Sequence, residues 1–397
     1  MNFVDFLVSN ILWRPVLGCF QGMGVSVVLP DGKKFNLGSE SSSDDPPIYI
    51  SNWSVFLDLL WGYDLGLAGS YISGKWHHEE LPDLFSRLSS QVGSSNTSVL
   101  AKIAPKKLIA RVEQMIRASN TIWWASRNVS SHYDKSNEFF SYFLDSSMTY
   151  SCGIFDNPDA TLGEAQQNKL DTLFKKSVMK AGDNVLDIGC GWGGLISRAV
   201  EMYDVKVTGV TLSKEQYDYT RSLLRSLGIE QFAGVVLQDY RRTQGKYDHI
   251  FSVEMLEAVG HKGIYEFFDK SWDLLSERGS LQVQVITIPD DRYDSYRTNC
   301  DFIQKYVFPG GLLPSLKVVN EAARISGFRL VESTSIGKHY ATTLKQWRDR
   351  LNENREDILK AGFSEEDLRR FDYYFSYCEG AFRAQRIDNF QLSYVKA

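Results

Sequence analysis

A glycine-rich segment, LDIGCGWGG, places Gly189, Gly191 and Gly194 directly after an apolar run and before a helical one. The spacing satisfies the G-x-G-x-x-G pattern, in which glycines let the backbone turn tightly and approach a nucleotide cofactor. A dinucleotide would also need an acidic residue about twenty positions later to bind its ribose. The next strand instead ends in GVTLS, with Thr211 and no carboxylate, so a dinucleotide is disfavoured.

Two aspartates lie where a cofactor could bind. Asp187 stands two residues before the first glycine, at the carboxyl edge of its strand, where its carboxylate could pair with a free ammonium group. S-adenosylmethionine carries such an ammonium. Asp239 follows Gln238 at the end of AGVVLQD, where an adenine amino group could be bound. The alternatives are that Asp187 caps the next helix and that Asp239 forms a turn.

The elements that would position these residues alternate from about residue 180 onward. Six apolar runs are predicted to be strands, with mostly helical stretches between them, and NFQLSYVKA could add a last strand: NVLDIGC, KVTGVTL, AGVVLQD, YDHIFSV, GSLQVQVITI and FRLVESTSI. This alternation predicts an α/β fold with a doubly wound, Rossmann-like, mainly parallel sheet. The N-terminal part is predicted to be a smaller mixed α+β domain, with short strands at VSVVLP and PIYIS and a helical run through VFLDLLWGYDLGLAGSYISG.

A Ser-rich segment, SSQVGSSNTS, has the composition of a linker. We therefore predict a small domain at 1–90, a linker and helical connector at 91–130, and a catalytic domain at 131–397. Basic residues of the connector could face solvent or anionic lipid. The N-terminal stretch MNFVDFLVSNILWRPVLGCF is too short and broken to span a bilayer. It would either lie on lipid as an amphipathic helix or pack on its own domain.

The composition excludes some classes of function. A formal net charge of −5 argues against a nucleic-acid-binding protein, because phosphate binding needs a basic face. The five cysteines are odd in number and widely spaced, which fits neither a disulfide framework nor a metal site and indicates reducing cytoplasm. An aromatic content of 13% suggests large apolar cavities or an apolar substrate as well as ordinary packing.

Ordered segments along nearly the whole chain resemble the cyclopropane fatty acid synthases and related S-adenosylmethionine-dependent fatty acid methyltransferases. The most specific are HYDKSNEFFSYFLDSSMTYSCGIF, AQQNKL, VLDIGCGWGGL, GVTLSKEQ, LQDY, SVEMLEAVGHKGIYEFF, DFIQKYVFPGGLLPS, HYATTL and YYFSYCEGAF. The first ninety residues also resemble the N-terminal domain of the longer members, which the shorter mycolic-acid enzymes lack. The resemblance implies unsaturated phospholipid acyl chains as substrate, a cytoplasmic enzyme on the inner face of the membrane, and a homodimer.

The resemblance also implies which residues bind S-adenosylmethionine. From the methionine end of the cofactor through its ribose to its adenine, they are Tyr150 and Ser151, then Gly189 and Gly191, then Thr211, Leu212 and Gln216, and lastly Gln238 and Asp239.

In the family a bicarbonate ion lies beside the reactive methyl group, and the matching residues here are Cys152, Glu257, Ile286 and Tyr340. Bicarbonate would take a proton, while Glu257 and Tyr340 would position it. Where well-known bacterial members have a histidine, this chain has Gln284, which can form hydrogen bonds but cannot titrate near neutral pH.

The implied reaction explains why such groups are needed. An alkene is a poor nucleophile, so an apolar tunnel must align it with the sulfonium methyl and exclude water. Methyl transfer leaves a cation, which aromatic faces can stabilise, and loss of a proton from the new methyl closes a cyclopropane ring. Loss of a different proton after a hydride shift would give a methylene- or methyl-branched chain, and a third alternative is C-methylation of a soluble small molecule.

Cys378, in YCEGAF, matches a cysteine suspected of catalysis in the family. Methyl transfer to an alkene needs no covalent enzyme intermediate, so packing is the alternative role for this thiol.

Overall fold

The computed structural model describes residues 8–18, 24–38, 45–90, 109–111, 114 and 136–397. The chain divides into two compact units, which we describe separately. The smaller comprises Met1–Gln114, Thr298–Val307 and Leu351–Arg386, and the larger comprises Met115–Arg297, Phe308–Arg350 and Ile387–Ala397. Most of the predicted connector at 91–130 lies outside the described residues, so the domain limits stay a prediction. The sequence did not indicate that two later segments would join the N-terminal unit.

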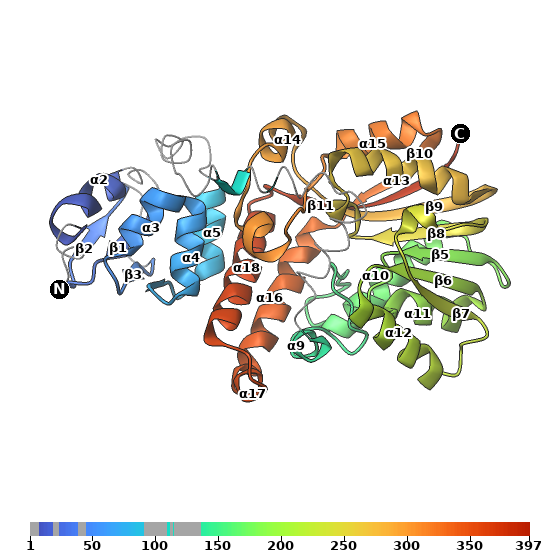
Figure 1. The fold of residues 1–397 in the computed structure, drawn as a ribbon, viewed down its shortest axis with the longest axis horizontal. Helices are drawn as coiled ribbons and strands as arrows, with labels where there is room; N and C mark the ends of the chain where they lie inside the picture. Colours follow the sequence, from blue (N-terminus) through green and yellow to red (C-terminus); the bar gives the residue numbers. More distant parts are fainter. Residues whose placement is uncertain (1–7, 19–23, 39–44, 91–108, 112–113, 115–135) are drawn as a thin grey trace. The chain divides into compact units, whose positions relative to one another are not determined.

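The larger unit is built on a seven-stranded sheet in the order β10-β11-β9-β8-β5-β6-β7 (Figure 1). Its strands are β5 (Asn184–Ile188), β6 (Lys206–Thr211), β7 (Ala233–Leu237), β8 (Tyr247–Val253), β9 (Leu275–Thr287), β10 (Phe328–Ser335) and β11 (Asp388–Lys396). Strands β5 to β9 pair in parallel, whereas β11 runs antiparallel to both β9 and β10. The predicted Rossmann-like fold with a mainly parallel sheet is confirmed.

Helices cover both faces of this sheet. The helices that contact its strands are α10 (Leu162–Ser177), α11 (Gly194–Tyr203), α12 (Lys214–Ser226), α13 (Gly260–Leu274) and α15 (Leu316–Ile325). Further helices of this unit are α9 (Asn137–Ser141), α14 (Asp290–Arg297) and α16 (Gly337–Glu353), whose last three residues belong to the smaller unit. Neighbouring residues of β5 belong to different apolar clusters: Val185 packs with α10 and α11, and Leu186 packs with α13 and α15. Successive strand residues point to opposite faces, so the sheet is buried on both sides, as parallel sheets generally are.

The smaller unit contains a four-stranded mixed sheet in the order β2-β1-β3-β4, as predicted for the N-terminal part. Its elements include β1 (Ser26–Val28), β2 (Lys34–Asn36), β3 (Ile48–Ile50), β4 (Trp76–His77), α2 (Trp13–Gly18), α3 (Val55–Gly62), α4 (Asp64–Ile72), α5 (Leu81–Ser90), α17 (Arg355–Lys360) and α18 (Glu365–Arg383). The predicted helical run is broken at Tyr63, whose φ of 51° ends α3 and starts α4. Trp13 and Val16 are buried, which favours packing over lipid binding for the described part of the N-terminal stretch.

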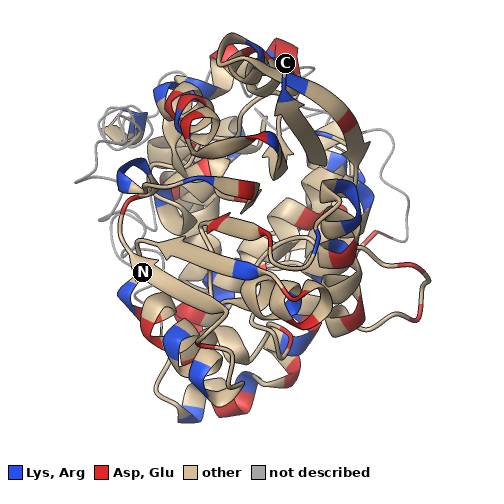
Figure 2. Ribbon diagram, turned by 90° about the vertical axis from the view of Figure 1, so that its right-hand side faces the viewer, with Lys and Arg blue, Asp and Glu red and all other residues tan. Residues whose placement is uncertain are grey.

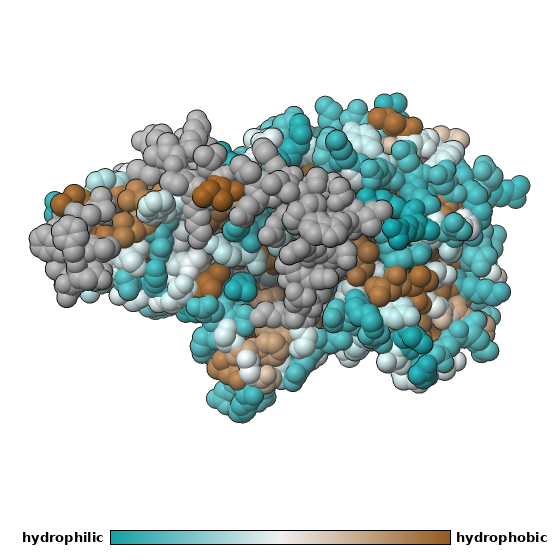
Figure 3. All heavy atoms as spheres, in the orientation of Figure 1, coloured by the Kyte–Doolittle hydropathy of each residue, from teal (hydrophilic) through white to brown (hydrophobic). Residues whose placement is uncertain are grey.

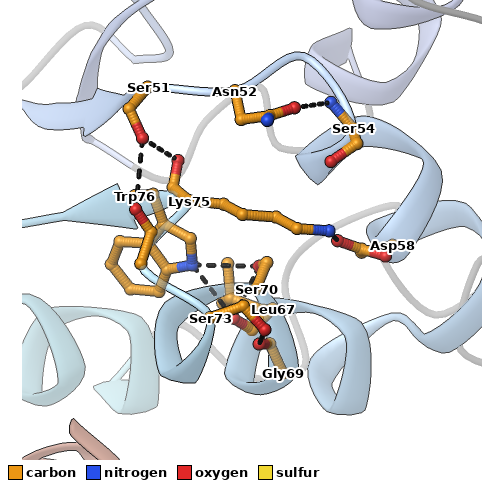
Figure 4. A network of polar contacts seen from close by, with 11 residues as sticks. Ser51, Asn52, Ser54, Asp58, Leu67, Gly69, Ser70, Ser73, Lys75 and Trp76 are labelled. Atoms are coloured by element: carbon orange, nitrogen blue, oxygen red, sulfur yellow. Dashed lines mark hydrogen bonds and ion pairs between the residues drawn. The ribbon is translucent and has the colours of Figure 1, made fainter. Parts of the chain in front are cut away.

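Polar contacts fasten β4 to the helices of the smaller unit (Figure 4). The ammonium of Lys75 lies 2.6 Å from a carboxylate oxygen of Asp58 on α3. The indole N–H of Trp76 is shared between the carbonyl of Leu67, at 2.9 Å, and the hydroxyl of Ser70, at 3.1 Å. A buried indole therefore keeps its hydrogen bonds while its ring joins the core.

Helix α18, although late in the sequence, packs on α4 and α5 of the smaller unit. The guanidinium of Arg369 lies 4.3 Å from the ring centroid of Tyr71 and donates to the carbonyls of Tyr71 and Trp76 at 2.6 and 2.9 Å. The hydroxyl of Tyr71 donates to Asp372 at 2.5 Å. The ring of Tyr373 contacts those of Tyr71 and Phe85. These contacts make α18 part of the core of the N-terminal unit.

The surface is mixed in charge and polarity. Lys and Arg alternate with Asp and Glu along the described helices in the view of Figure 2. The face in Figure 3 is mostly hydrophilic with separate apolar patches. Among the described residues, none of the helices is long and apolar enough to cross a membrane.

Candidate active site

The candidate site lies at the carboxyl ends of the central strands of the larger unit. Strand β5 lies between β6 and β8, where the order of the strands reverses along the sheet. Ligands of open α/β sheets bind at such a switch point. The ends of β5 and β8 bring Asp187 and Glu254 to this edge, and β9 contributes Gln284.

The glycine loop after β5 depends on backbone conformations that favour glycine. Gly189 and Gly191 have φ values of 81° and 55°. A Cβ atom on Gly189 would lie 2.8 Å from the side chain of Met255, whereas one on Gly191 would meet no atom within 4 Å. Gly191 therefore leaves open space beside the backbone, which is where a ligand can approach.

Asp187 is buried, and its Oδ2 accepts no hydrogen bond from the described residues. Burial raises the pKa of Asp187 to about 7, although the nearby ammonium of Lys169 acts in the opposite direction. A buried carboxylate oxygen without a partner is costly unless a ligand supplies a donor. Together with the open space at Gly191, this oxygen fits the ammonium group of S-adenosylmethionine.

Lys169 is a buried residue that sequence reasoning missed. Its Nζ donates to the hydroxyl of Ser151 at 2.8 Å, and the neighbouring Gln166 donates to the carbonyl of Ser151 at 2.7 Å. Burial lowers the pKa of Lys169 to about 8 against the attraction of Glu254 and other nearby acidic groups. Helical spacing was the available signal, because the buried positions of α10 recur at Leu162, Gln166, Lys169 and Leu173.

The residues predicted to bind ribose are brought together at the start of α12. The hydroxyl of Thr211 donates to the side-chain oxygen of Gln216 at 2.8 Å and accepts from the backbone of Ser213 at 3.1 Å. Ser213 in turn caps α12 by accepting from the backbone of Gln216. Leu212 lies between them and is half-buried. Thr211 and Gln216 thus form one rigid hydrogen-bonded pair at the end of β6.

The residues predicted to face adenine have partners of their own. Asp239 accepts from the backbone, Nε and Nη2 of Arg241 at 3.0, 2.8 and 2.6 Å, and opens a 3-10 turn at Tyr240–Arg242. Burial alone would raise the pKa of Asp239, but the Arg241 hydrogen bonds lower it below its ordinary value. Gln238 donates to the hydroxyl of Thr243 at 3.3 Å. The turn-forming alternative for Asp239 is therefore observed, and adenine binding stays a prediction.

Glu254 is the second residue that sequence reasoning missed. Its carboxylate accepts hydrogen bonds from residues in four parts of the larger unit. Oε1 accepts from the backbone of Cys152 at 3.0 Å, from Nε2 of Gln284 at 2.9 Å and from Nδ2 of Asn389 at 2.6 Å. Oε2 accepts from the hydroxyl of Tyr340 at 2.6 Å. The rule that singled out Asp187, a carboxylate at the carboxyl end of an apolar strand, also applies to Glu254.

Three of these donors belong to residues predicted to bind bicarbonate. Gln284 also donates to the carbonyl of Cys152 at 3.3 Å, and its oxygen accepts from Gln391 at 3.1 Å. The antiparallel register of β9 and β11 places Gln391 opposite Gln284. Since these donors already bind Glu254, this arrangement does not fit a separate bicarbonate ion.

Glu257 and Ile286, the other predicted bicarbonate ligands, contact each other. The backbone N–H of Ile286 donates to Oε1 of Glu257 at 2.5 Å, whereas Oε2 is buried and has no partner among the described residues. Burial and, to a smaller extent, the negative charge of Glu254 together raise the pKa of Glu257 to about 8. Glu257 is therefore held as the neutral acid at pH 7.

Comparison with known proteins decides the family. Residues 123–392 match the profile of the family described as mycolic acid cyclopropane synthetase. The chain belongs to this family of S-adenosylmethionine-dependent fatty acid methyltransferases. The resemblance inferred from the motifs is thereby confirmed, and the chain is an enzyme of the cyclopropane synthetase family.

Relatives in the cyclopropane synthetase family are named for different activities. Tuberculostearic acid methyltransferase UfaA1 of Mycobacterium tuberculosis is 34% identical over 340 residues, which are 84% of this chain and 79% of that protein. A probable fatty acid methyltransferase of Pseudomonas putida is 38% identical over 68% of each chain. The crystal structure of mycolic acid cyclopropane synthase CmaA1 with SAH and CTAB is 35% identical, covers 68% of this chain and 98% of that one, and has a TM-score of 0.65.

An aromatic cluster joins the predicted methionine end of the cofactor site to Glu254. The ring of Tyr150 lies 5.4 Å from that of Phe140 and 5.1 Å from that of Trp347. Trp347 also contacts the ring of Tyr340, at 6.1 Å, whose hydroxyl binds Glu254. Aromatic faces attract a positive charge, so the cluster could stabilise a cation formed beside Tyr150.

Neither candidate cysteine has the surroundings of a nucleophile. Burial and the charge of Glu254 raise the pKa of the Cys152 thiol well above its ordinary value. Cys378 lies on α18 in the smaller unit, whereas the other candidate site residues belong to the larger one. Burial and Asp301 raise its pKa as well. A catalytic thiol needs a lowered pKa, so both cysteines fit packing roles.

Proposed function

We propose that this enzyme transfers a methyl group from S-adenosylmethionine to the cis double bond of an unsaturated phospholipid acyl chain and closes a cyclopropane ring by losing a proton. The observation that carries this proposal is the connection of three parts: the buried Asp187 carboxylate, the aromatic cluster around Tyr150 and the paired acids Glu254 and Glu257. The cofactor supplies an electrophilic methyl group. The three parts would bind its ammonium, stabilise a carbocation and remove a proton.

The predicted cofactor contacts follow the same order along the site. Asp187 would pair with the ammonium, and Ser151 is held in place by Lys169. Gly189 and Gly191 would let the backbone approach the ligand. Thr211 and Gln216 would bind the ribose as a hydrogen-bonded pair.

We further propose that the enzyme works in the cytoplasm, at the inner face of a membrane, as a homodimer. A phospholipid acyl chain has to be drawn from the bilayer before it can reach a buried site. The smaller unit would contribute to lipid handling or dimerisation. The match to UfaA1 bears on this role, because it extends over 84% of the chain and therefore beyond the larger unit.

The same match favours a second product. UfaA1 is named for methylation in tuberculostearic acid, not for ring formation. Both products would share the first cation and differ in the proton lost afterwards. We therefore keep a methylene- or methyl-branched acyl chain as the alternative outcome.

The test is incubation with S-adenosylmethionine and vesicles of a monounsaturated phospholipid, followed by mass spectrometry and proton NMR of the acyl chains. We expect a gain of one carbon per double bond and the upfield signals of a cyclopropane. Vinylidene or branched-methyl signals would establish the alternative. Vesicles of the saturated phospholipid are the matched control, and free monounsaturated fatty acid tests whether the head group matters. Transfer to the free acid alone would overturn the phospholipid assignment.

A further inference from the structure

Glu254 adopts a backbone conformation that residues with a Cβ rarely take. Its φ is 50°, and its N–H donates to the carbonyl of Gln284 at 2.8 Å. Strain of this kind persists only where the surrounding structure holds it, and it gathers at functional sites. The strained turn sends the side chain of Glu254 toward Cys152, Tyr340 and Asn389.

The carboxylate of Glu254 is surrounded by hydrogen-bond donors, as a bound anion would be. The backbone of Cys152 and the side chains of Gln284, Asn389 and Tyr340 all act as donors toward it. Both carboxylate oxygens of Glu254 therefore act as hydrogen-bond acceptors, and the donors fix their positions.

The acidic groups next to Glu254 are kept neutral. Burial and then the charge of Glu254 raise the pKa of Glu257 to about 8, so this carboxyl is protonated at pH 7. The Cys152 thiol is kept neutral in the same way. The buried ammonium of Lys169 is attracted to Glu254 and offsets part of its charge.

We propose that Glu254 is the catalytic base, and that its carboxylate takes the place which the family resemblance assigns to bicarbonate. The inference rests on the proposed function, because it names the group that completes that reaction. Three of the predicted bicarbonate donors hold Glu254 instead, and the fourth contact, from Asn389, comes from a strand that the motif comparison did not include.

The proton transfer balances without another reactant. The alkene electron pair forms the new carbon–carbon bond to the methyl group while the carbon–sulfur bond breaks and S-adenosylhomocysteine leaves. The resulting acyl carbocation loses a proton to Oε2 of Glu254, and the electrons of that C–H bond close the ring or form a methylene. Oε2 is the better acceptor, because among the described residues it binds one donor, Tyr340, whereas Oε1 binds three.

The decisive measurement is the bicarbonate dependence of the wild-type enzyme, since it needs no variant. Lipid methylation is followed in buffer and vesicles stripped of carbon dioxide, with and without added bicarbonate. We expect the two rates to agree within about twofold, because a base within the chain needs no dissolved anion. A large loss on depletion that bicarbonate reverses would overturn the proposal.

Variants of Glu254 distinguish the loss of its charge from the loss of its side-chain volume. Glu254→Gln keeps the shape but not the charge and is expected to lower turnover by roughly 10²- to 10⁴-fold, the range for losing a positioned base. Glu254→Gly relieves the backbone and frees the donors, so added formate or bicarbonate should restore activity at least about tenfold. Restoration of Glu254→Gln should be absent, since the amide still occupies the site. Near-wild-type turnover of Glu254→Gln would overturn the proposal.

The controls distinguish this proposal from the proposed function itself. Glu321→Gln makes the same chemical change at an exposed position of α15 and should leave the rate unchanged. The affinity of each variant for S-adenosylmethionine, measured by calorimetry, should match the wild type if Glu254 acts only on the substrate. A wild-type protein that binds S-adenosylmethionine but modifies no lipid would refute the proposed function. An active Glu254→Gln variant would refute only the assignment of Glu254 as the base and leave the proposed function standing.

Discussion

Lys169 and Asp187 carry opposite charges in the buried interior of the larger unit, and each favours the charged form of the other. The pKa of Asp187 is nevertheless raised to about 7 by burial. Without cofactor, the Asp187 carboxylate is therefore close to taking up a proton at neutral pH. This balance makes cofactor binding sensitive to pH.

We expect the affinity for S-adenosylmethionine to fall as the pH drops below about 7, by at most about tenfold per pH unit, because an ammonium prefers the ionised carboxylate. Calorimetric titrations between about pH 8 and about pH 5.5 measure this. Asp187→Asn should bind weakly at every pH and show no such slope. An unchanged affinity in folded Asp187→Asn would contradict the assignment.

The same shift predicts an opposite effect on stability. A carboxyl whose pKa is higher in the folded than in the unfolded state stabilises the fold at low pH, and this contribution is lost as the pH rises through about 7. Asp187→Asn cannot ionise, so it should raise the melting temperature of the cofactor-free protein at about pH 8 and change it little only below about pH 4, where the carboxyl is neutral in both the folded and the unfolded state. Equal melting temperatures at the higher pH would contradict the burial of the charge.

Gly191 and Gly228 provide a matched pair for the cofactor loop. Both have positive φ, of 55° and 67°, and a Cβ on either would meet no atom within 4 Å. Alanine at either position should cost a similar, small amount of stability, about 1 kcal/mol. Only Gly191→Ala should weaken binding of S-adenosylmethionine, because only Gly191 lies in the loop after β5. Equal binding by the two variants in calorimetry would place the cofactor elsewhere.

Glu257 should set the alkaline limit of activity. Its pKa of about 8 means that the carboxyl ionises above that pH and adds a second negative charge beside Glu254. We expect the rate in wild type to fall as the pH rises through about 8, whereas Glu257→Gln, which stays neutral, should lose this decline. Rates of lipid methylation measured across this pH range decide it. A decline retained in Glu257→Gln would assign the titration to another group.

The two thiols should be dispensable for chemistry. Cys152 contacts Glu254 through its backbone, and Cys378 has a raised pKa in the smaller unit. We expect Cys152→Ala and Cys378→Ala to retain turnover within about tenfold, with any loss accompanied by a lower melting temperature. A loss of turnover of about a thousandfold or more in a stable Cys378→Ala variant would instead support a catalytic role for this thiol.

Much of the fold follows from local patterns, because strands such as β5, β6 and β8 are short, mainly buried runs bounded by turn residues. The glycine loop and Asp187 could be predicted for the same reason. The position of β11 in the sheet could not be predicted. Nothing within NFQLSYVKA indicates that this strand enters between β9 and β10 or that Gln391 pairs with Gln284, 107 residues away.

Glu254 illustrates the other limit of the sequence. The segment SVEMLEAVG contains two glutamates three positions apart, and the family comparison drew attention to Glu257. Which carboxylate receives the donors is decided by the left-handed turn at Glu254, and a bulky residue gives no local sign of such a conformation. Tyr63, which divides the predicted helix of the smaller unit, was missed for the same reason.

The discontinuity of the smaller unit has a consequence for biosynthesis. The segment with α4 and α5 precedes the larger unit in the chain, but α18, which packs on these two helices, follows the strands from β5 to β10. At ordinary elongation rates Tyr373 would be synthesised roughly 15 to 60 s after Tyr71 and Phe85, and the contacts between these rings could form only then. The helices α4 and α5 would thus complete their packing only after most of the larger unit has been synthesised. We expect ribosome-bound chains that stop before Leu351 to remain protease-sensitive around α4 and α5 and to recruit chaperones, whereas the strands from β5 to β9 become protected earlier.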